Sequence, residues 1–145
     1  MSIRFFTDGG SRGNPGLSAA GVFFPDLDGG LRRGVYIGND KTNNEAEYYA
    51  LLLGLEIAAE RQVPRIEIFS DSMLMVNHMI GKWQVKAPTI LPLYYKAFAM
   101  RQRFEGLNIS YVPREKNTEA DAVVNSVMDR VAAGEEIPKF KQLIL

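Results

Sequence analysis

Alternating apolar and polar residues predict three short strands in the first part of the chain. Ile3–Thr7 is a β-prone run that leads into the glycine-rich segment beginning at Asp8. Ala19–Phe24 and Leu31–Ile37 have the same character, and the turn-forming residues 26–30 lie between them. Together these runs predict an antiparallel meander of three strands.

Helices and strands alternate in the rest of the chain. Asn43 or Asn44 can cap a long helix that continues to about Gln62, with Leu51, Leu52, Leu55 and Ala59 on its buried side. The further elements expected are strands at Arg65–Ser70 and Leu107–Val112 and helices at Ser72–Ile80, Ile90–Phe104 and Thr118–Ala133. This order predicts an α/β fold with one five-stranded mixed sheet and helices on both of its faces.

The length of 145 residues suits a single domain, and the sequence contains no repeat or long linker. We expect the domain to occupy residues 1–133 and a C-terminal tail to occupy residues 134–145. The pair Ile137-Pro138 argues against a continuation of the last helix. Because the tail also contains Phe140, Leu143, Ile144 and Leu145, we expect it to pack on the domain.

Composition excludes several classes of protein. Hydrophobic residues make up 46% and charged residues 23%, as in globular rather than disordered chains. No apolar run approaches the roughly 18 residues of a membrane span, and Met1–Phe6 is too short for a signal peptide. The absence of cysteine excludes disulfides and thiolate metal sites. We therefore expect a cytoplasmic protein without a membrane partner, and we expect a monomer.

The net charge of +0 does not by itself indicate a nucleic-acid-binding protein. Residues 81–104, however, contain five basic residues and no acidic one: Lys82, Lys86, Lys96, Arg101 and Arg103. Such a stretch can contact phosphates. It can equally be a solvated basic helix face that acids elsewhere balance, and the charge pattern leaves both interpretations open.

Four acids stand next to the predicted strand ends and helix starts. Asp8 and Asp71 directly follow strands, whereas Glu47 and Asp121 lie early in helices. Strand ends and nearby helix starts can meet at one edge of a sheet, where ligand sites of open α/β proteins form. Each acid also has a purely structural interpretation, as a turn residue, a helix cap or a partner of the helix dipole. Spacing alone does not show that the four converge.

Convergence of these acids would have a definite chemical consequence. Carboxylates brought within a few ångströms repel one another, and divalent cations with a preference for oxygen ligands, Mg²⁺ or Mn²⁺, relieve that repulsion. Two such ions about 3.5–4 Å apart hold both the attacking water and the leaving oxygen of a phosphodiester. The acids therefore suggest phosphodiester hydrolysis.

Four motifs, at the order and spacing of one known family, carry a resemblance over about residues 3–130. The chain resembles type 1 ribonuclease H, and it resembles most the shorter, archaeal-like branch without a basic protrusion. The motifs are Phe6-Thr7-Asp8-Gly9-Gly10-Ser11-Arg12-Gly13-Asn14-Pro15-Gly16, Thr42-Asn43-Asn44-Glu45-Ala46-Glu47-Tyr48, Ser70-Asp71-Ser72 and Pro113-Arg114-Glu115-Lys116-Asn117-Thr118-Glu119-Ala120-Asp121.

The resemblance implies the ribonuclease H fold and a catalytic site that binds metal through Asp8, Glu47, Asp71 and Asp121. Glu47 rather than Glu45 matches the family position. Arg114 stands in a loop where many members carry a histidine thought to assist product release; it can position a phosphate but cannot act as a base near pH 7. The one histidine, His78, is interpreted as a helix-surface or core residue.

The resemblance also implies residues that contact the substrate, an RNA–DNA hybrid. Amide side chains suit the recognition of RNA because they offer both a donor and an acceptor to the 2′-hydroxyl. Glycines allow close backbone approach, a threonine matches a phosphate-binding position, and a tryptophan matches an aromatic of the DNA channel, although a lone tryptophan more often belongs to a core. These residues are Gly9, Gly10, Gly13, Asn14, Thr42, Asn43, Asn44 and Trp83.

Two departures from the family concern substrate binding. Met73 replaces a common glutamine, and Lys82–Pro88 is too short for the basic protrusion of some bacterial members. The resemblance thus implies an endoribonuclease with two metal ions that leaves 5′-phosphate and 3′-hydroxyl ends, with RNA duplexes open as further substrates. The alternatives are another two-metal nuclease of the superfamily and a non-catalytic nucleic-acid-binding module. A nucleotide-binding enzyme is disfavoured, because the sequence contains neither a Gly-Lys-Ser/Thr phosphate loop nor the glycine pattern of dinucleotide-binding proteins.

Overall fold

A five-stranded mixed sheet forms the centre of the computed structural model, which describes residues 2–139. The strand order is β3-β2-β1-β4-β5. Antiparallel pairing joins β1 (Ser2–Arg12) to β2 (Gly16–Phe24) and β2 to β3 (Leu31–Lys41). Parallel pairing joins β1 to β4 (Arg65–Ser70) and β4 to β5 (Gly106–Tyr111). The predicted α/β class and sheet are confirmed.

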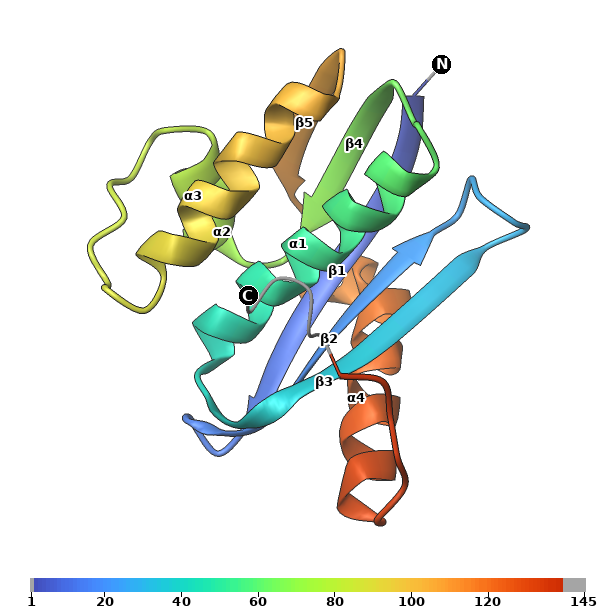
Figure 1. Cartoon of the computed structure of the whole chain (residues 1–145), viewed down its shortest axis with the longest axis vertical. Helices are drawn as coiled ribbons and strands as arrows, with labels where there is room; N and C mark the ends of the chain where they lie inside the picture. The colour runs from blue at the N-terminus through green and yellow to red at the C-terminus, as the bar shows by residue number, and fades with distance from the viewer. Residues whose placement is uncertain (1, 140–145) are drawn as a thin grey trace.

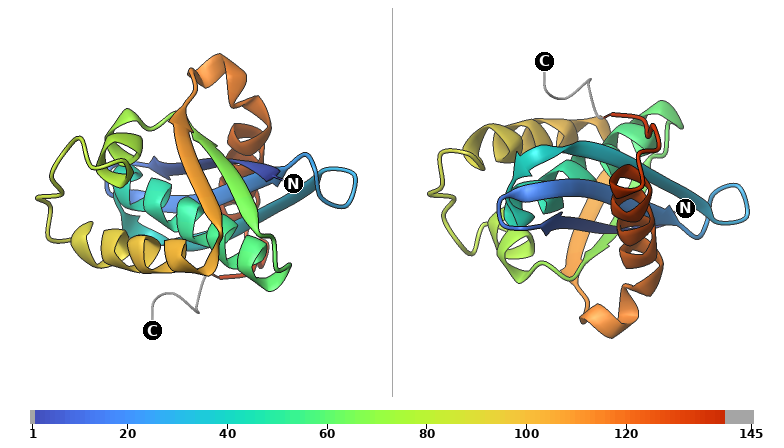
Figure 2. Two further views of the ribbon diagram at one scale, coloured as in Figure 1. Left: turned by 90° about the horizontal axis from the view of Figure 1, so that it is seen from above. Right: turned by 90° about the horizontal axis from the view of Figure 1, so that it is seen from below.

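Helices cover both faces of the sheet (Figure 1). On one face lies α1 (Asn43–Glu60), and α3 (Leu91–Met100) packs against it. Figure 2 shows α4 (Thr118–Ala132) on the opposite face. The remaining helical elements are α2 (Met73–Met79) and the short 3₁₀ helices η1 (Arg101–Arg103) and η2 (Arg114–Lys116). Each helix expected from the sequence is present, with shifts of one or two residues, except that the expected helix to Phe104 ends in η1.

The first strand is longer than its sequence pattern predicted. Its pairing with β2 continues through Gly9 and Gly10 to Arg12, which lies opposite Leu17. The prediction of a loop after Thr7 was wrong because the ladder with β2 compensates for the weak strand preference of glycine. As a result Asp8 lies inside a strand, opposite Gly21 of β2 and one residue beyond Thr7, the last residue of β1 that pairs with β4.

The helix α1 begins one residue earlier than a cap at Asn43, and two earlier than a cap at Asn44, would place it. Thr42 is the N-cap and forms a capping box with Glu45, in which each side chain accepts a hydrogen bond from the other residue's backbone N–H. The helix is buried on nearly all sides rather than on one side only, because α3 covers the face that turns away from the sheet. Only the predicted Ala59 remains partly exposed.

A second apolar cluster lies under α4. Val124, Val127 and Met128 pack on Ala19 of β2. Gly21 and Gly34 face this helix, and a Cβ at either position would meet the Val123 side chain. The two glycines therefore let α4 approach the sheet closely enough to place its N-terminal turn beside the end of β4.

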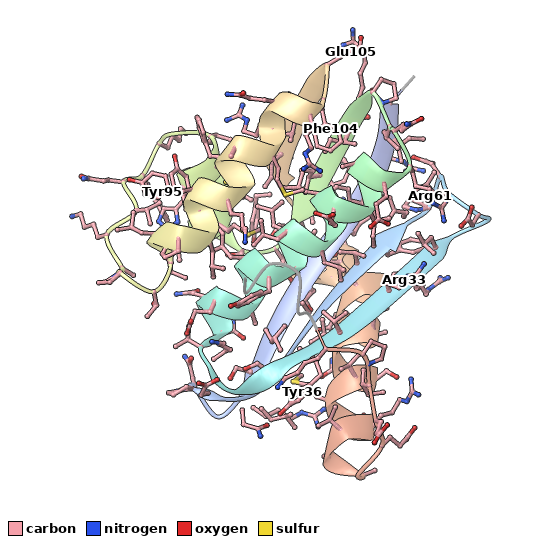
Figure 3. The ribbon with its side chains drawn as sticks, viewed as in Figure 1. Arg33, Tyr36, Arg61, Tyr95, Phe104 and Glu105 are labelled. Carbon is pink, nitrogen blue, oxygen red and sulfur yellow. The ribbon has the colours of Figure 1, made fainter. Side chains whose placement is uncertain are left out.

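The described part of the tail contacts the other edge of the sheet. Tyr36 on β3, labelled in Figure 3, donates its N–H to the carbonyl of Pro138 over 3.0 Å. Ile137 packs against the α4 cluster. The apolar residues Phe140, Leu143, Ile144 and Leu145 lie outside the described residues. Among the described helices, none combines the length and the apolar character needed to cross a membrane.

Gly54 in the middle of α1 gives a test of this packing. The Phe5 ring of β1 occupies the place where a Cβ at position 54 would lie. Intrinsic helix preference alone would favour alanine by about 1 kcal/mol, but we expect overpacking to lower the free energy of unfolding of Gly54→Ala by about 1–3 kcal/mol. Urea denaturation measures this. Glu60→Ala, at an exposed position of the same helix, is the control, and a Gly54→Ala protein more stable than wild type would contradict the packing.

Candidate active site

Strand register brings Asp8 and Asp71 together. Thr7 of β1 lies beside Ser70 of β4 in the parallel ladder, so the next residue on each strand is one of the two acids. Parallel strands present their carboxyl ends at the same edge of a sheet, and ligand sites of open α/β proteins form there. The two carboxylates are thus neighbours because of backbone pairing, without any need for a contact between their side chains.

Glu47 reaches the same place from α1. Its Oε1 accepts a hydrogen bond of 2.7 Å from the backbone N–H of Gly9. A side chain at position 9 would overlap the backbone of Ala46 and Glu47, so glycine is required for α1 to lie so close to β1. One carboxylate oxygen each of Asp8, Glu47 and Asp71 lies within 4.8 Å of the others.

Asp121 approaches from the opposite face of the sheet, in the first turn of α4. Its carboxyl adds to the effects of burial and of the Asp71 charge, which raise the pKa of Asp8. All four acids line one open, mostly polar cleft of about 550 Å³. The convergence that spacing alone left open is therefore present in the structure.

Burial and mutual repulsion make these carboxyls hard to ionise. Burial and the nearby Asp71 raise the pKa of Asp8 to about 8. Glu47 is 5% exposed, and burial together with the charges of Asp8 and Asp71 raises its pKa well above the usual range. Burial also raises the pKa of Asp71. Such a site favours any positive charge that can enter it.

Arg114 supplies one positive charge at the rim of the cleft. It lies in η2 and lines the cleft, and its charge lowers the pKa of both Glu47 and Asp71. An exposed guanidinium opposes the raised pKa values only partly. The acids of the cleft therefore outweigh the single positive charge of Arg114. A phosphate placed at this rim would lie near both the guanidinium and the acids.

Of the residues expected to contact substrate, some line the cleft and the others lie next to it. Gly9, Gly10 and Asn43 line the cleft with the acids. Gly9 faces α1 and Gly10 faces Val124 of α4, so both serve the packing of helices on β1. Gly13 has a φ of +81° and forms the turn that follows β1.

Polar residues around this turn are tied to the start of α1. Asn14 accepts a hydrogen bond of 3.0 Å from the backbone N–H of Asn43 through its amide oxygen. Thr42 forms the capping box, and Asn44 is exposed in the first turn. The capping box also engages Glu45, which agrees with the choice of Glu47 as the acid of the cleft. Gly13, Asn14, Thr42 and Asn44 thus lie next to the cleft but do not line it.

Trp83 and His78 have opposite environments. Trp83 is 45% exposed, in the loop between α2 and α3, so it is not a core residue. His78 is buried, and its Nδ1 lies 2.7 Å from the hydroxyl of Tyr48. Burial lowers the pKa of His78, and the histidine belongs to the core between α2 and α1.

Several residues of the site were not singled out from the sequence, among them Arg12, Tyr111 and Asn117. Arg12 and Tyr111 line the cleft, and the Arg12 guanidinium lies 2.6 Å from the Asp129 carboxylate. Asn117 is buried behind the acids. Arg12 and Asn117 lie inside the family motifs, four residues after Asp8 and four before Asp121, and their place in these motifs was the available signal.

Comparison with known proteins agrees with this geometry. A family model described as reverse transcriptase-like matches residues 6–127. The crystal structure of RNase H1 from the halophilic archaeon Halobacterium salinarum has a TM-score of 0.84 at 37% identity, covering 89% of this chain and 98% of that one. The chain belongs to the ribonuclease H family. This match also fits the archaeal-like branch expected from the sequence.

Two further family members extend the comparison. LC11-RNase H1, solved in complex with an RNA/DNA hybrid, has a TM-score of 0.82 at 36% identity and covers 90% of this chain and 99% of its own. The bifunctional protein Rv2228c of Mycobacterium tuberculosis is 39% identical over 134 residues. That match covers 91% of this chain and 37% of the mycobacterial protein, so the chain spans well under half the length of this relative.

The raised pKa of Asp8 predicts an unusual pH dependence of stability. Between its ordinary pKa of 3.8 and about 8, the folded chain binds more protons at Asp8 than the unfolded chain does. Stability in chelator therefore falls as pH rises through this window. At pH 8.5 we expect Asp8→Asn to raise Tm by about 3–8 °C, and by much less at pH 4.5.

Calorimetry in EDTA measures this difference. Asp40→Asn, which neutralises an acid whose side chain is 82% exposed, should leave Tm nearly unchanged at both pH values. An Asp8→Asn protein that is no more stable than wild type at pH 8.5 would show that the acids do not repel one another.

Proposed function

We propose that this chain is an endoribonuclease that cuts the RNA strand of RNA–DNA hybrids with the help of two divalent cations. One observation carries the proposal: four carboxylates from β1, α1, β4 and α4 line one cleft, in a chain of the ribonuclease H family. The relative LC11-RNase H1 binds a hybrid of this kind in its crystal structure, which supports the choice of substrate. The proposed products carry 5′-phosphate and 3′-hydroxyl ends.

The four acids fit a site for Mg²⁺ or Mn²⁺. Asp8, Glu47 and Asp71 offer carboxylate oxygens within 4.8 Å of one another, and Asp121 adds a fourth carboxyl. Hard oxygen donors suit these cations, and the raised pKa values reflect repulsion that a cation relieves. When bound, a pair of such ions supplies Lewis-acid stabilisation to attacking and leaving oxygens of a phosphodiester.

The chain's own residues orient the acids and the phosphate. The N–H of Gly9 holds one oxygen of Glu47, which leaves the other oxygen for a ligand. Arg114 cannot accept a proton near pH 7 because guanidinium stays charged. We assign it to binding a phosphate oxygen at the rim of the cleft, where its planar group matches phosphate geometry.

Recognition of the RNA strand is assigned to the turn after β1 and the start of α1. The hydrogen bond between Asn14 and the backbone of Asn43 joins these segments into one surface, and Asn43 and Asn44 are exposed on it. Their amides offer donors and acceptors to 2′-hydroxyls, which distinguish RNA from DNA. Gly9, Gly10 and Gly13 keep the adjoining backbone free of side chains.

Binding of the DNA strand is assigned to Thr42 and Trp83. The capping box uses the Thr42 hydroxyl as an acceptor, so its proton can be donated to a phosphate. Trp83 is exposed beside Lys82 and Lys86, and aromatic and basic groups in combination suit a nucleic-acid strand. Activity on RNA duplexes, a monomeric state, a cytoplasmic location and a domain boundary near residue 133 stay predictions.

Cleavage assays with a labelled hybrid test the proposal. We expect wild type to cut only the RNA strand, in the presence of Mg²⁺ or Mn²⁺, and Asp8→Asn to abolish cutting because it removes a charge shared by the site. DNA and RNA duplexes of the same sequence serve as substrate controls. A well-folded wild type that leaves the hybrid intact with both metals contradicts the proposal. Binding without cutting would instead support a non-catalytic module, and cutting of DNA alone another nuclease.

Arg114 gives a prediction about rate. Loss of a cation that stabilises the reacting phosphate should lower kcat of Arg114→Ala by about 100-fold, with intermediate activity for Arg114→Lys. Lys116→Ala removes an equal charge from the same 3₁₀ turn, at a residue that does not line the cleft, and should keep its kcat. Steady-state kinetics on the hybrid distinguish these outcomes, and equal kcat values for the Arg114→Ala and Lys116→Ala proteins would remove Arg114 from the reaction.

A further inference from the structure

Asn117 connects three of the elements that carry the acids. Its Nδ2 donates a hydrogen bond of 2.9 Å to the carbonyl of Thr7, the residue before Asp8. Its side chain also lies close enough to Asp71 to lower the pKa of that carboxyl, against the larger effect of burial, which raises it. Its backbone carbonyl accepts from the N–H of Asp121 over 3.2 Å. One residue therefore touches β1, the end of β4 and the first turn of α4.

The backbone of Asn117 also fixes the loop that carries the rim cation. Its N–H donates to the carbonyl of Arg114 over 3.0 Å. Asn117 is 1% exposed, so these interactions are made away from solvent. A shift of this residue would move the Arg114 turn and the start of α4 together.

Asn117 does not form the side-chain hydrogen bond that asparagine usually forms at the start of a helix. Asn117 is the N-cap of α4, yet its side chain makes no capping hydrogen bond. Asparagine is among the strongest N-caps because its side-chain oxygen accepts from the helix N-terminus. Here Oδ1 is buried without a hydrogen-bond partner among the described residues, and an unpaired buried acceptor destabilises a fold. The position thus retains a side chain that does not optimise stability.

Chemistry explains the choice of an amide. The Thr7 carbonyl that Asn117 binds is an acceptor, and so is the Asp71 carboxylate nearby, which suits the two donors of a planar –NH₂ group. Aspartate has no donor when ionised, and serine has a single one. The unpaired Oδ1 is then a consequence of directing the nitrogen towards the acids.

We propose that Asn117 is a positioning residue that ties the end of β1 to the first turn of α4 and so sets the spacing of the acids for cation binding. The inference rests on the proposed function for the role of the cation. Asn117 need not touch metal or substrate for this. Partners that orient metal-binding carboxylates through hydrogen bonds commonly change metal affinity or activity by about 10- to 100-fold when removed.

Calorimetric titration with Mn²⁺ in the absence of nucleic acid tests the proposal on the full chain. We expect Asn117→Ala to raise the Kd for Mn²⁺ by about 10- to 100-fold. Asn117→Ser should raise this Kd by a similar factor. Serine caps helices well, so we expect this variant to fold. Asn108→Ala, which removes an exposed amide on β5, is the matched control and should bind Mn²⁺ as wild type does.

Kinetics on the hybrid separate positioning from a general loss of structure. Both Asn117 variants should unfold cooperatively, reach a lower kcat at saturating hybrid and keep KM, because the surface for RNA is untouched. An unchanged Kd for Mn²⁺ in a folded Asn117→Ser protein overturns the proposal, as does an effect confined to KM. If wild type binds Mn²⁺ more tightly than the variants but cuts no hybrid, the positioning role stands and the proposed ribonuclease activity fails. A wild type that binds no Mn²⁺ overturns both.

Discussion

Electrostatic repulsion among buried carboxylates is the constraint that shapes this site. Asp8, Glu47 and Asp71 present oxygens within 4.8 Å of one another, and burial removes the water that would otherwise screen them. Interactions from outside the cluster hold the acids in place: the register of β1 and β4 for the two aspartates, and the Gly9 N–H for Glu47. The fold thus maintains a charge arrangement that is unfavourable until a cation enters.

Glycine at position 9 shows how directly the fold and the site depend on each other. The close approach of α1 to β1 that brings Glu47 to Asp8 requires a residue without a side chain there. Glycines in β2 and β3 have the same effect for α4 and Asp121 on the other face. The sheet can therefore receive acids from both of its faces because β1, β2 and β3 carry glycine where a helix packs on them.

The class of fold could be predicted from the sequence because period-2 and helical patterns are strong in this chain. The four acids could be proposed because each follows or begins a predicted element, and the resemblance to ribonuclease H put them in one set. The hydrophobic pattern alone could not show that β1 continues past Asp8. Pairing with β2 compensates for the weak strand preference of Gly9 and Gly10, and this pairing joins residues that the local pattern does not connect. The pattern also could not assign Thr42 rather than Asn43 as the cap of α1, since each has a capping side chain.

The role of Asn117 was invisible for a different reason. An asparagine before a helix predicts a cap, and only the three-dimensional contacts show its amide donating to the carbonyl of Thr7 instead. Trp83 likewise has an apolar side chain typical of a core, and its exposure depends on a loop that follows α2. Residues whose partners lie far away in the chain are the ones that sequence reasoning misses.

Proton release on metal binding is the most direct measure of the central claim, that cations relieve the repulsion of these acids. Asp8 has a pKa of about 8, so it holds a proton for the most part near pH 7, and a metal must displace that proton. Calorimetry with Mn²⁺ at pH 7, in two buffers of different ionisation enthalpy, counts the protons released. We expect the release of about one proton per chain at pH 7, declining towards zero above pH 9. Binding without proton release at pH 7, or no binding at all, would contradict it.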